Sequence, residues 1–166
     1  MKPMRMVVMV VLALILTGGL VAQAQPQQKM KPQAHVLTAA ELQWVDAPPT
    51  VPPGAKIAVL EGDPKKPGPF TLRFKLPADY KVPPHWHPGV EHTTVLSGTI
   101  YVGMGTTFDP AKGQALPPGS FSVMQPKTPH FAWTKEEVVL QAHGMGPWGI
   151  TYINPADDPS KKVGQR

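Results

Sequence analysis

Apolar and polar side chains alternate along several short stretches of this chain. The clearest case is residues 70–76, FTLRFKL, where a polar side chain separates each apolar one from the next. A period of two places the apolar side chains on one face, which is typical of a half-buried β-strand. The pattern therefore predicts a strand whose core-facing residues are Phe70, Leu72, Phe74 and Leu76.

Further strand-like stretches follow one another between proline and glycine residues. They are KIAVLEG (56–62), YKVPPHWH (80–87), EHTTVLSGTIYVGM (91–104), GSFSVMQ (119–125), HFAWT (130–134) and VVLQAHG (138–144). Turns at this spacing leave little room for long helices, and strands do not alternate with helical patterns. Many short strands with frequent turns indicate an all-β sandwich or closed barrel.

The two ends of the mature chain lack this pattern. Residues 25–54 are expected to form a flexible or irregular lead-in with one helical turn, capped by Thr38 and Glu41. The proline-rich stretch APPTVPPGA, residues 47–55, would end any helix there. Residues 155–166 are expected to form a polar tail.

The first residues have the composition of an export signal. Lys2 and Arg5 precede a short uncharged apolar run, and Ala22 and Ala24 occupy the small-residue positions of a cleavage site. The run is too short to span a bilayer comfortably, although an uncleaved membrane anchor is the alternative. We therefore expect residues 1–24 to be a cleaved signal peptide. The protein would then be periplasmic or secreted, with no membrane contact after cleavage.

Composition and charge exclude several other classes of protein. The chain has no cysteine, so disulfides and an anchor on a lipidated cysteine are excluded. Removing Lys2 and Arg5 from the sixteen basic residues leaves fourteen against eleven acidic ones, a net charge of about +3. Lysines occur in pairs, and no concentrated basic footprint with stacking aromatic residues is visible. We therefore expect no nucleic-acid partner.

Histidines are concentrated in one short stretch, PPHWHPGVEHTT, although the whole chain has only six. Side chains two residues apart on a strand point to the same face, so His85 and His87 can reach one ion. A Pro-Gly turn follows them and would fold Glu91 back beside them. Two neutral imidazoles and a carboxylate suit iron, manganese, nickel or zinc. A solvated loop decorated with histidines is the alternative.

Together with a second stretch, GSFSVMQPKTPH, this segment resembles the two motifs of the cupin family. The first motif reads G(x)5HxH(x)3-4E(x)6G, and its core is matched in order and spacing by His85, His87, Glu91 and Gly98. The second motif reads G(x)5PxGxxH(x)3N, and it is matched by Gly119 and His130.

The chain departs from both motifs at turn and packing positions. Tyr80 or a neighbour, Ala78 or Asp79, stands at the leading glycine of the first motif. In the second motif the proline, the glycine and the final asparagine are replaced by Gln125, Lys127 and Thr134. These departures concern loop geometry more than the metal ligands.

The resemblance implies an all-β fold, an antiparallel jelly-roll (double-stranded β-helix) barrel of the cupin type, over residues 55–154. It also implies a divalent transition metal inside the barrel, such as iron, manganese, nickel or zinc. The metal ligands carried over from the motifs are His85, His87, Glu91 and His130. Because cupins commonly pair, the resemblance further favours a homodimer.

Two more histidines lie on the predicted strands. His92 adjoins Glu91, so on a regular strand it faces away from the ion. His143 belongs to the alternation of residues 138–144 and could face the barrel mouth as a proton acceptor, which makes it a catalytic candidate. A packed core or rim histidine is the alternative reading of this residue.

The cupin fold alone does not select an activity. We expect a metal-dependent, dioxygenase-like enzyme that acts on a small oxygenated organic molecule. The alternatives are a non-catalytic binding or sensing module and a metal-dependent lyase or isomerase. A general base such as His143 in the cavity would favour the lyase or isomerase. An apolar pocket without such a base would favour the oxygenase, and a shallow plugged barrel would favour the binding module.

Overall fold

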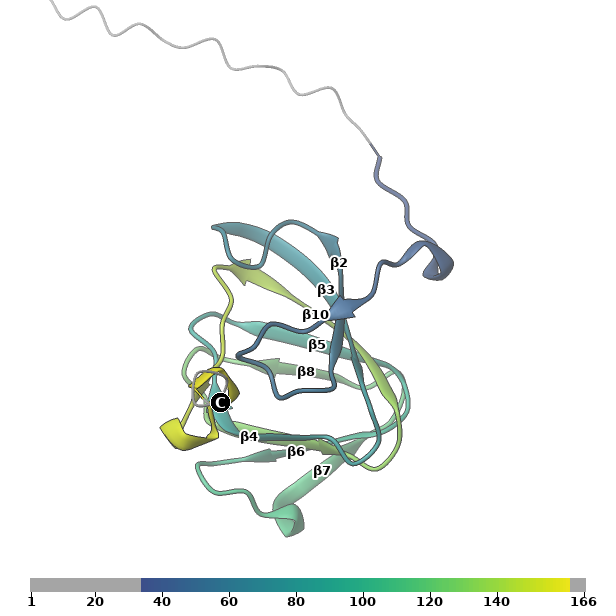
Figure 1. Cartoon of the computed structure of the whole chain (residues 1–166). Helices are drawn as coiled ribbons and strands as arrows, with labels where there is room; N and C mark the ends of the chain where they lie inside the picture. Colours follow the sequence, from purple (N-terminus) through teal and green to yellow (C-terminus); the bar gives the residue numbers. More distant parts are fainter. Residues whose placement is uncertain (1–33, 162–166) are drawn as a thin grey trace, which may run out of the picture. The chain divides into compact units, whose positions relative to one another are not determined.

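A computed structural model describes residues 34–161 of the chain (Figure 1). The predicted signal peptide, residues 1–24, and its cleavage site lie outside the described residues, as do residues 162–166 of the predicted tail. Within the described part, no helix is long and apolar enough to cross a bilayer.

The described strands form two antiparallel sheets, which Figure 1 shows one above the other. The strand order is β1-β2-β3-β10-β5-β8 in the six-stranded sheet and β11-β4-β9-β6-β7 in the five-stranded sheet. The strands are β1 (Val45–Asp46), β2 (Lys56–Glu61), β3 (Gly68–Leu76), β4 (Lys81–Trp86), β5 (Glu91–Ser97), β6 (Ile100–Met104), β7 (Gly113–Leu116), β8 (Phe121–Met124), β9 (His130–Thr134), β10 (Val138–Gly146) and β11 (Thr151–Tyr152). Short 3-10 turns are η1 (Ala39–Glu41), η2 (Pro110–Lys112), η3 (Pro155–Asp157) and η4 (Pro159–Lys161).

The chain crosses from one sheet to the other at most of its turns. From β3 to β6, and again from β8 to β11, successive strands belong to alternate sheets. This connectivity, with every pairing antiparallel, is that of a jelly roll. The predicted all-β jelly-roll fold is therefore confirmed.

The core lies between the two sheets, and β3 supplies much of it. Phe70, Leu72, Phe74 and Leu76 are all buried, as the alternation predicted. Phe70 and Leu72 are only 1% exposed. A large apolar side chain that is fully buried stabilises the fold by about 1.5–3 kcal/mol relative to an exposed one.

Two turns next to the motifs hold non-glycine residues in the left-handed region of φ. Asp79, between β3 and β4, has φ 57°, and Lys127, between β8 and β9, has φ 60°. The backbone N–H of Lys127 donates to the carbonyl oxygen of His87 at 2.9 Å. The turn before β9 is therefore tied directly to the end of β4.

Thr134, which stands at the asparagine position of the second motif, is only 2% exposed. Its Oγ1 donates to the carbonyl oxygen of Pro77 at 2.7 Å and accepts from the backbone N–H of Tyr80 at 3.0 Å. A buried hydroxyl whose hydrogen is donated and whose oxygen accepts a second hydrogen bond costs little to remove from water. Thr134 thus links the end of β9 to the turn between β3 and β4.

Part of the predicted lead-in is built into the fold. The backbone N–H of Thr38 donates to Oε2 of Glu41 at 2.7 Å, so the predicted helical turn forms as the 3-10 turn η1. β1 pairs with β2 along the edge of the six-stranded sheet. The loop of residues 47–55 then places Val51 in the hydrophobic core, where it is 8% exposed.

Candidate metal centre

The cross-strand register of the five-stranded sheet brings the two motifs together. His85 lies in β4, His87 follows the end of β4, and His130 is the first residue of β9. β4 and β9 are antiparallel neighbours in which His85 is paired with His130. Glu91 begins β5 in the other sheet. Residues far apart in the sequence are therefore neighbours in the fold.

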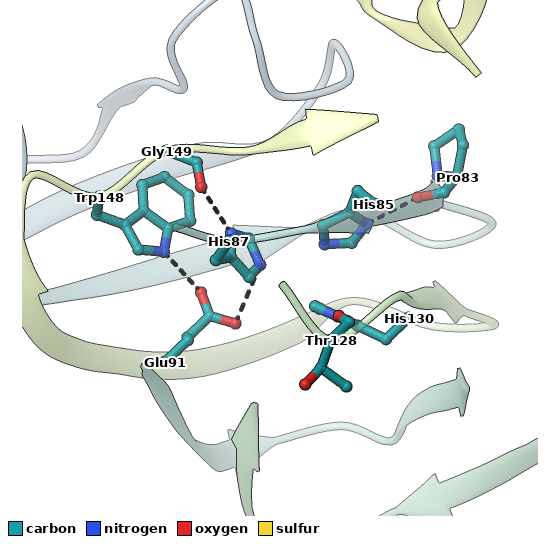
Figure 2. Close-up of polar contacts among 8 residues, drawn as sticks. All are labelled: Pro83, His85, His87, Glu91, Thr128, His130, Trp148 and Gly149. Atoms are coloured by element: carbon teal, nitrogen blue, oxygen red, sulfur yellow. Dashed lines mark hydrogen bonds and ion pairs between the residues drawn. The ribbon is translucent and has the colours of Figure 1, made fainter. Parts of the chain in front are cut away.

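The three histidines form a compact, buried cluster (Figure 2). Each can offer one ring nitrogen such that these atoms all lie within 4.8 Å of one another. His85, His87 and His130 are 4%, 3% and 5% exposed. Their ring centroids lie 4.2 Å apart for His85 and His130, and 4.9 Å apart for His85 and His87.

A backbone carbonyl fixes the tautomer of each of these imidazoles. The Nδ1–H groups of His85 and His87 donate to the carbonyl oxygens of Pro83 and Gly149, at 2.7 and 2.8 Å. Nδ1–H of His130 donates likewise to the carbonyl oxygen of Thr128 at 3.0 Å. A carbonyl can only accept, so every Nδ1 carries a proton, and in the neutral ring Nε2 then keeps a free electron pair. Ligand histidines in metalloproteins are oriented in this way.

Burial also favours the neutral form of two of these histidines, His85 and His130. It lowers the pKa of His85 well below its usual value, and the neighbouring His130 and His87 add to the effect. Burial lowers the pKa of His130 as well, while its bond to the Thr128 carbonyl and the nearby Glu91 oppose the shift. Metal ions bind the neutral form of histidine. In their neutral form, three imidazoles that can each offer a ring nitrogen fit a divalent transition metal.

Glu91 lies beside the cluster and is held by a tryptophan. Its Oε2 is 3.4 Å from Nε2 of His87, and its Oε1 accepts from Nε1–H of Trp148 at 3.0 Å. The Trp148 ring also stacks on His87, with centroids 5.2 Å apart (Figure 2). The compact group of candidate ligand atoms contains the three histidines without Glu91. The assignment of Glu91 as a fourth ligand stays a prediction.

Trp148 and Gly149 support the site, yet no sequence signal identified them. They lie between β10 and β11, more than fifty residues after Glu91 and His87. Only the fold places this segment against the first motif.

The cluster faces a cavity of about 100 Å³ between the sheets. Most of its walls are apolar side chains of both sheets, including Phe74, Leu140 and Met124. Besides the site histidines and Glu91, its polar lining includes Thr93 and Ser122. Among the described residues that line the cavity, there is neither a lysine nor an arginine.

His92 and His143 lie away from this cavity. They are cross-strand partners on β5 and β10, and their rings stack with centroids 4.9 Å apart and planes 9° apart. His92 therefore has the orientation that alternation predicted. Neither residue lines the cavity. The expectation that His143 faces the barrel mouth is not met, because its register opposite His92 places it on the outer face. A proton-transfer role for His143 in the cavity has no geometric support.

Two facing antiparallel sheets, with motif histidines gathered inside, define the class of protein: this is a cupin. The chain belongs to the family described as "Domain of unknown function (DUF4437)", a cupin-type family, which it matches over residues 18–146. Comparison with curated protein sequences finds no match.

Solved structures support the same fold. The polyketide cyclase RemF from Streptomyces resistomycificus is 14% identical, with a TM-score of 0.64 over 80% of this chain and 94% of that chain. A putative acetylacetone dioxygenase from Methylibium petroleiphilum PM1 is 18% identical, with a TM-score of 0.60 over 79% of this chain and 88% of that chain. An RmlC-like cupin from Shewanella frigidimarina NCIMB 400 is 14% identical, with a TM-score of 0.53 over 68% and 91%. At such identities the likeness shows the fold alone.

Proposed function

We propose that this protein is an exported, metal-dependent enzyme with dioxygenase-like activity on a small oxygenated organic molecule. One observation carries the proposal. Three buried histidines, each held by a carbonyl at Nδ1, line a largely apolar cavity and can offer their Nε2 atoms to an ion. A site of this kind combines ligands for a metal with space for a substrate beside it.

The chain's own residues would hold the ion and shape the space around it. His85, His87 and His130 would bind the metal, and Glu91 is placed to join them. When bound, a divalent metal supplies Lewis-acid polarisation of a substrate oxygen and, if it is iron, reaction with dioxygen. The apolar walls would exclude water and fix the orientation of the substrate. In an oxidative cleavage of a carbon–carbon bond the substrate supplies all the electrons and both oxygen atoms enter the products, so this kind of dioxygenation needs no external reductant.

The cavity walls favour an oxygenase over a lyase or isomerase. Proton abstraction needs a base within hydrogen-bond reach of the substrate. His143 does not line the cavity, and the histidines of the cluster are committed to carbonyls through Nδ1. Glu91 is the one acidic side chain among the described residues that line it.

Glu91 nevertheless supports a second candidate function. Its carboxylate lies outside the compact group of three ligand nitrogens, and Trp148 occupies only one of its two oxygens. If the histidines alone hold the ion, Glu91 is free to act as the base of a metal-dependent lyase or isomerase. A Glu91→Gln variant that keeps its metal but loses turnover would favour this second function.

The test is metal analysis of the purified mature protein, followed by oxygen uptake with a panel of small oxygenated substrates. The proposal expects about one transition-metal ion per chain and substrate-dependent oxygen uptake that His130→Ala abolishes. Turnover without oxygen would establish the lyase or isomerase instead. A metal-loaded protein that binds these compounds without converting them would be a binding module.

Export is part of the proposal and needs its own measurement. The mass of the protein recovered from outside the cytoplasm should correspond to a chain that starts at Gln25. Recovery of the chain from Met1 in a membrane fraction would overturn both the cleavage and the location.

A further inference from the structure

Two histidines lie next to each other on the outer face of the six-stranded sheet, away from the cavity. His92 and His143 are cross-strand partners on β5 and β10, which lie side by side in Figure 1. Their ring planes differ by 9°, and their centroids are 4.9 Å apart. The outermost torsion of a histidine side chain is broad, so a turn of the His143 ring aims one nitrogen of each ring at a shared point. The pair therefore offers two imidazole nitrogens to one ion.

One nitrogen of this pair has no partner. Nδ1 of His92 is buried and makes no hydrogen bond within the part of the chain that the structure describes. Nearly all buried polar groups in folded proteins have a partner, and an exception is explained by an ion, a water molecule or a functional role. Phe121 and His143, on the two neighbouring strands, stack against the His92 ring, with centroids 6.0 and 4.9 Å away. His92 is thus a ring held in a fixed position.

A thioether lies on the same face as the two imidazoles. Met145 follows His143 by two positions on β10, so both side chains point outward. Met145 is 62% exposed, and its unbranched side chain has the freedom to turn toward His143. Imidazole suits copper, nickel and zinc, whereas a thioether is a soft ligand that favours Cu(I). Two imidazoles with one thioether therefore form a ligand set for copper.

Two groups of opposite charge flank the pair. Thr71 lies opposite His143 on β3, and its hydroxyl donates to Oε2 of Glu61 at 3.4 Å. Arg73, two residues further along β3, donates through Nε to Oε1 of Gln141 at 3.2 Å. The carboxylate attracts a cation at the histidine pair and the guanidinium repels it. Because these effects oppose each other, the ligand atoms decide the affinity.

We propose that His92, His143 and Met145 form a second metal site, which binds copper and is separate from the cavity. All three ligands come from one chain, so a second copy lying over this face would enclose the ion without supplying it. At the surface of a single chain the ion is open to water and to competing chelators. Dialysis therefore removes it before an ion held between the sheets, and the metal that remains reports the cavity site alone. The proposed enzymatic function is not needed for this site.

The experiment is a calorimetric titration of the full protein with copper sulfate and with zinc sulfate. The protein is first loaded with zinc and dialysed, and zinc released during the copper titration is measured. We expect one copper ion per chain to bind without release of the retained zinc, and more tightly than added zinc. A parallel titration with Cu(I), kept reduced by ascorbate, measures the affinity for the second oxidation state.

Two variants test the ligands. His143→Phe keeps a ring stacked on His92 and removes the nitrogens. It should weaken copper binding at least about 10- to 100-fold, because loss of a group that only supports a ligand already has that effect. Met145→Leu should weaken Cu(I) binding about 10-fold and change Cu(II) binding little, because the thioether is the soft ligand. His35→Ala is the matched control, since it removes an exposed histidine outside the pair and should bind copper as the wild type does.

Each outcome decides something different. His143→Phe with a wild-type melting temperature and wild-type copper affinity overturns the site. An equal loss of affinity in His35→Ala also overturns it, because copper would then bind single surface histidines. Unchanged Cu(I) binding in Met145→Leu overturns the role of the thioether. A protein that takes up no metal between the sheets overturns the proposed function alone, since the copper bound by the wild type and lost in His143→Phe is still that of the outer site.

Discussion

At the scale of single residues, His130 offers the sharpest test of the metal site. It lies forty-three positions after His87, and only the pairing of β9 with β4 brings it to the cluster. We expect His130→Ala to lower metal affinity by at least about 10- to 100-fold, since loss of a supporting partner alone has that effect. Metal content and melting temperature of the purified variant measure this.

His92→Ala is the matched control. His92 is a histidine of the same segment whose side chain faces the other side of the sheet. It should keep full metal content. Full metal in His130→Ala together with loss in His92→Ala would contradict the ligand assignment.

Trp148 should act on the metal through Glu91. Trp148→Phe keeps an aromatic ring near His87 but removes the N–H that donates to Oε1 of Glu91. We expect metal affinity to fall about 10-fold or more with the fold retained. Trp133→Phe serves as the control, because Trp133 is buried but does not line the cavity. Equal metal affinity in the two variants would remove Trp148 from the site.

Acid should destabilise the metal-free protein in a defined pH range. Burial lowers the pKa of His85 and of His130, whereas both titrate near 6.5 in the unfolded chain. Below that pH the unfolded state binds more protons, so stability decreases as the pH falls, by up to about 1.4 kcal/mol per pH unit for each histidine. The melting temperature after metal removal should be level above about pH 7 and fall between about pH 6.5 and 5.

A double variant isolates the two groups. His85→Gln with His130→Gln should flatten the pH dependence of the melting temperature in this range. A wild-type melting temperature that stays constant or rises from pH 7 to pH 5 is the contrary result.

At the scale of elements, the turns beside β4 and β9 keep the geometry of the cupin motifs without their glycines. Asp79 and Lys127 are the non-glycine residues with positive φ in the described chain. Left-handed φ costs most side chains about 1–2 kcal/mol, whereas aspartate tolerates it better. Replacing such a residue by glycine removes this cost, but part of the gain in stability is lost because glycine has more conformational freedom in the unfolded chain.

We therefore expect Lys127→Gly to stabilise the fold by about 0.5–1 kcal/mol. Asp79→Gly should change stability less, because the same conformation strains aspartate less. Equilibrium unfolding in urea measures both. A Lys127→Gly variant that is no more stable than Asp79→Gly would show that the turn before β9 is not strained.

The sequence predicted elements well where one face of a strand is buried. The alternation in residues 70–76 and the shared face of His85 and His87 depend only on local geometry, and both appear in the fold as expected. The place of His130 beside them depends on the pairing of β9 with β4 and was predicted only through the motif resemblance. β1 has only two residues, which is too short to show an alternation of apolar and polar side chains. It forms because β2 offers a free edge. The contact of Trp148 with Glu91 and the orientation of His143 depend on which residues of distant strands lie opposite each other. The pattern of apolar and polar residues along one strand does not contain this information.

At the scale of the whole molecule, we propose the outer face of the six-stranded sheet as the interface of the homodimer that the sequence leads us to expect. Phe121, Val123 and Met145 are 56%, 41% and 62% exposed there, next to the stacked His92 and His143. Exposed apolar groups on a sheet face favour association with another surface. We expect a dimeric mass by light scattering at micromolar concentration.

Variants on the two sheets separate this face from others. Phe121→Glu should convert the dimer to a monomer with little change in fold. Met104→Glu introduces the same charge at a half-exposed position of the five-stranded sheet and should leave the dimer intact. A monomeric wild-type protein would end the proposal of a homodimer.

The carbonyl that fixes His87 comes from Gly149, sixty-two residues further along the chain. The complete ligand environment therefore exists only after β10 and the segment following it have docked. An ion cannot template such a site at the start of folding, as it does in small metal-nucleated domains. The folded apoprotein would acquire its ion afterwards. Added metal would then raise the free energy of unfolding by mass action and leave the folding rate unchanged. Refolding rates with and without metal should be equal, while unfolding in the presence of metal should be slower.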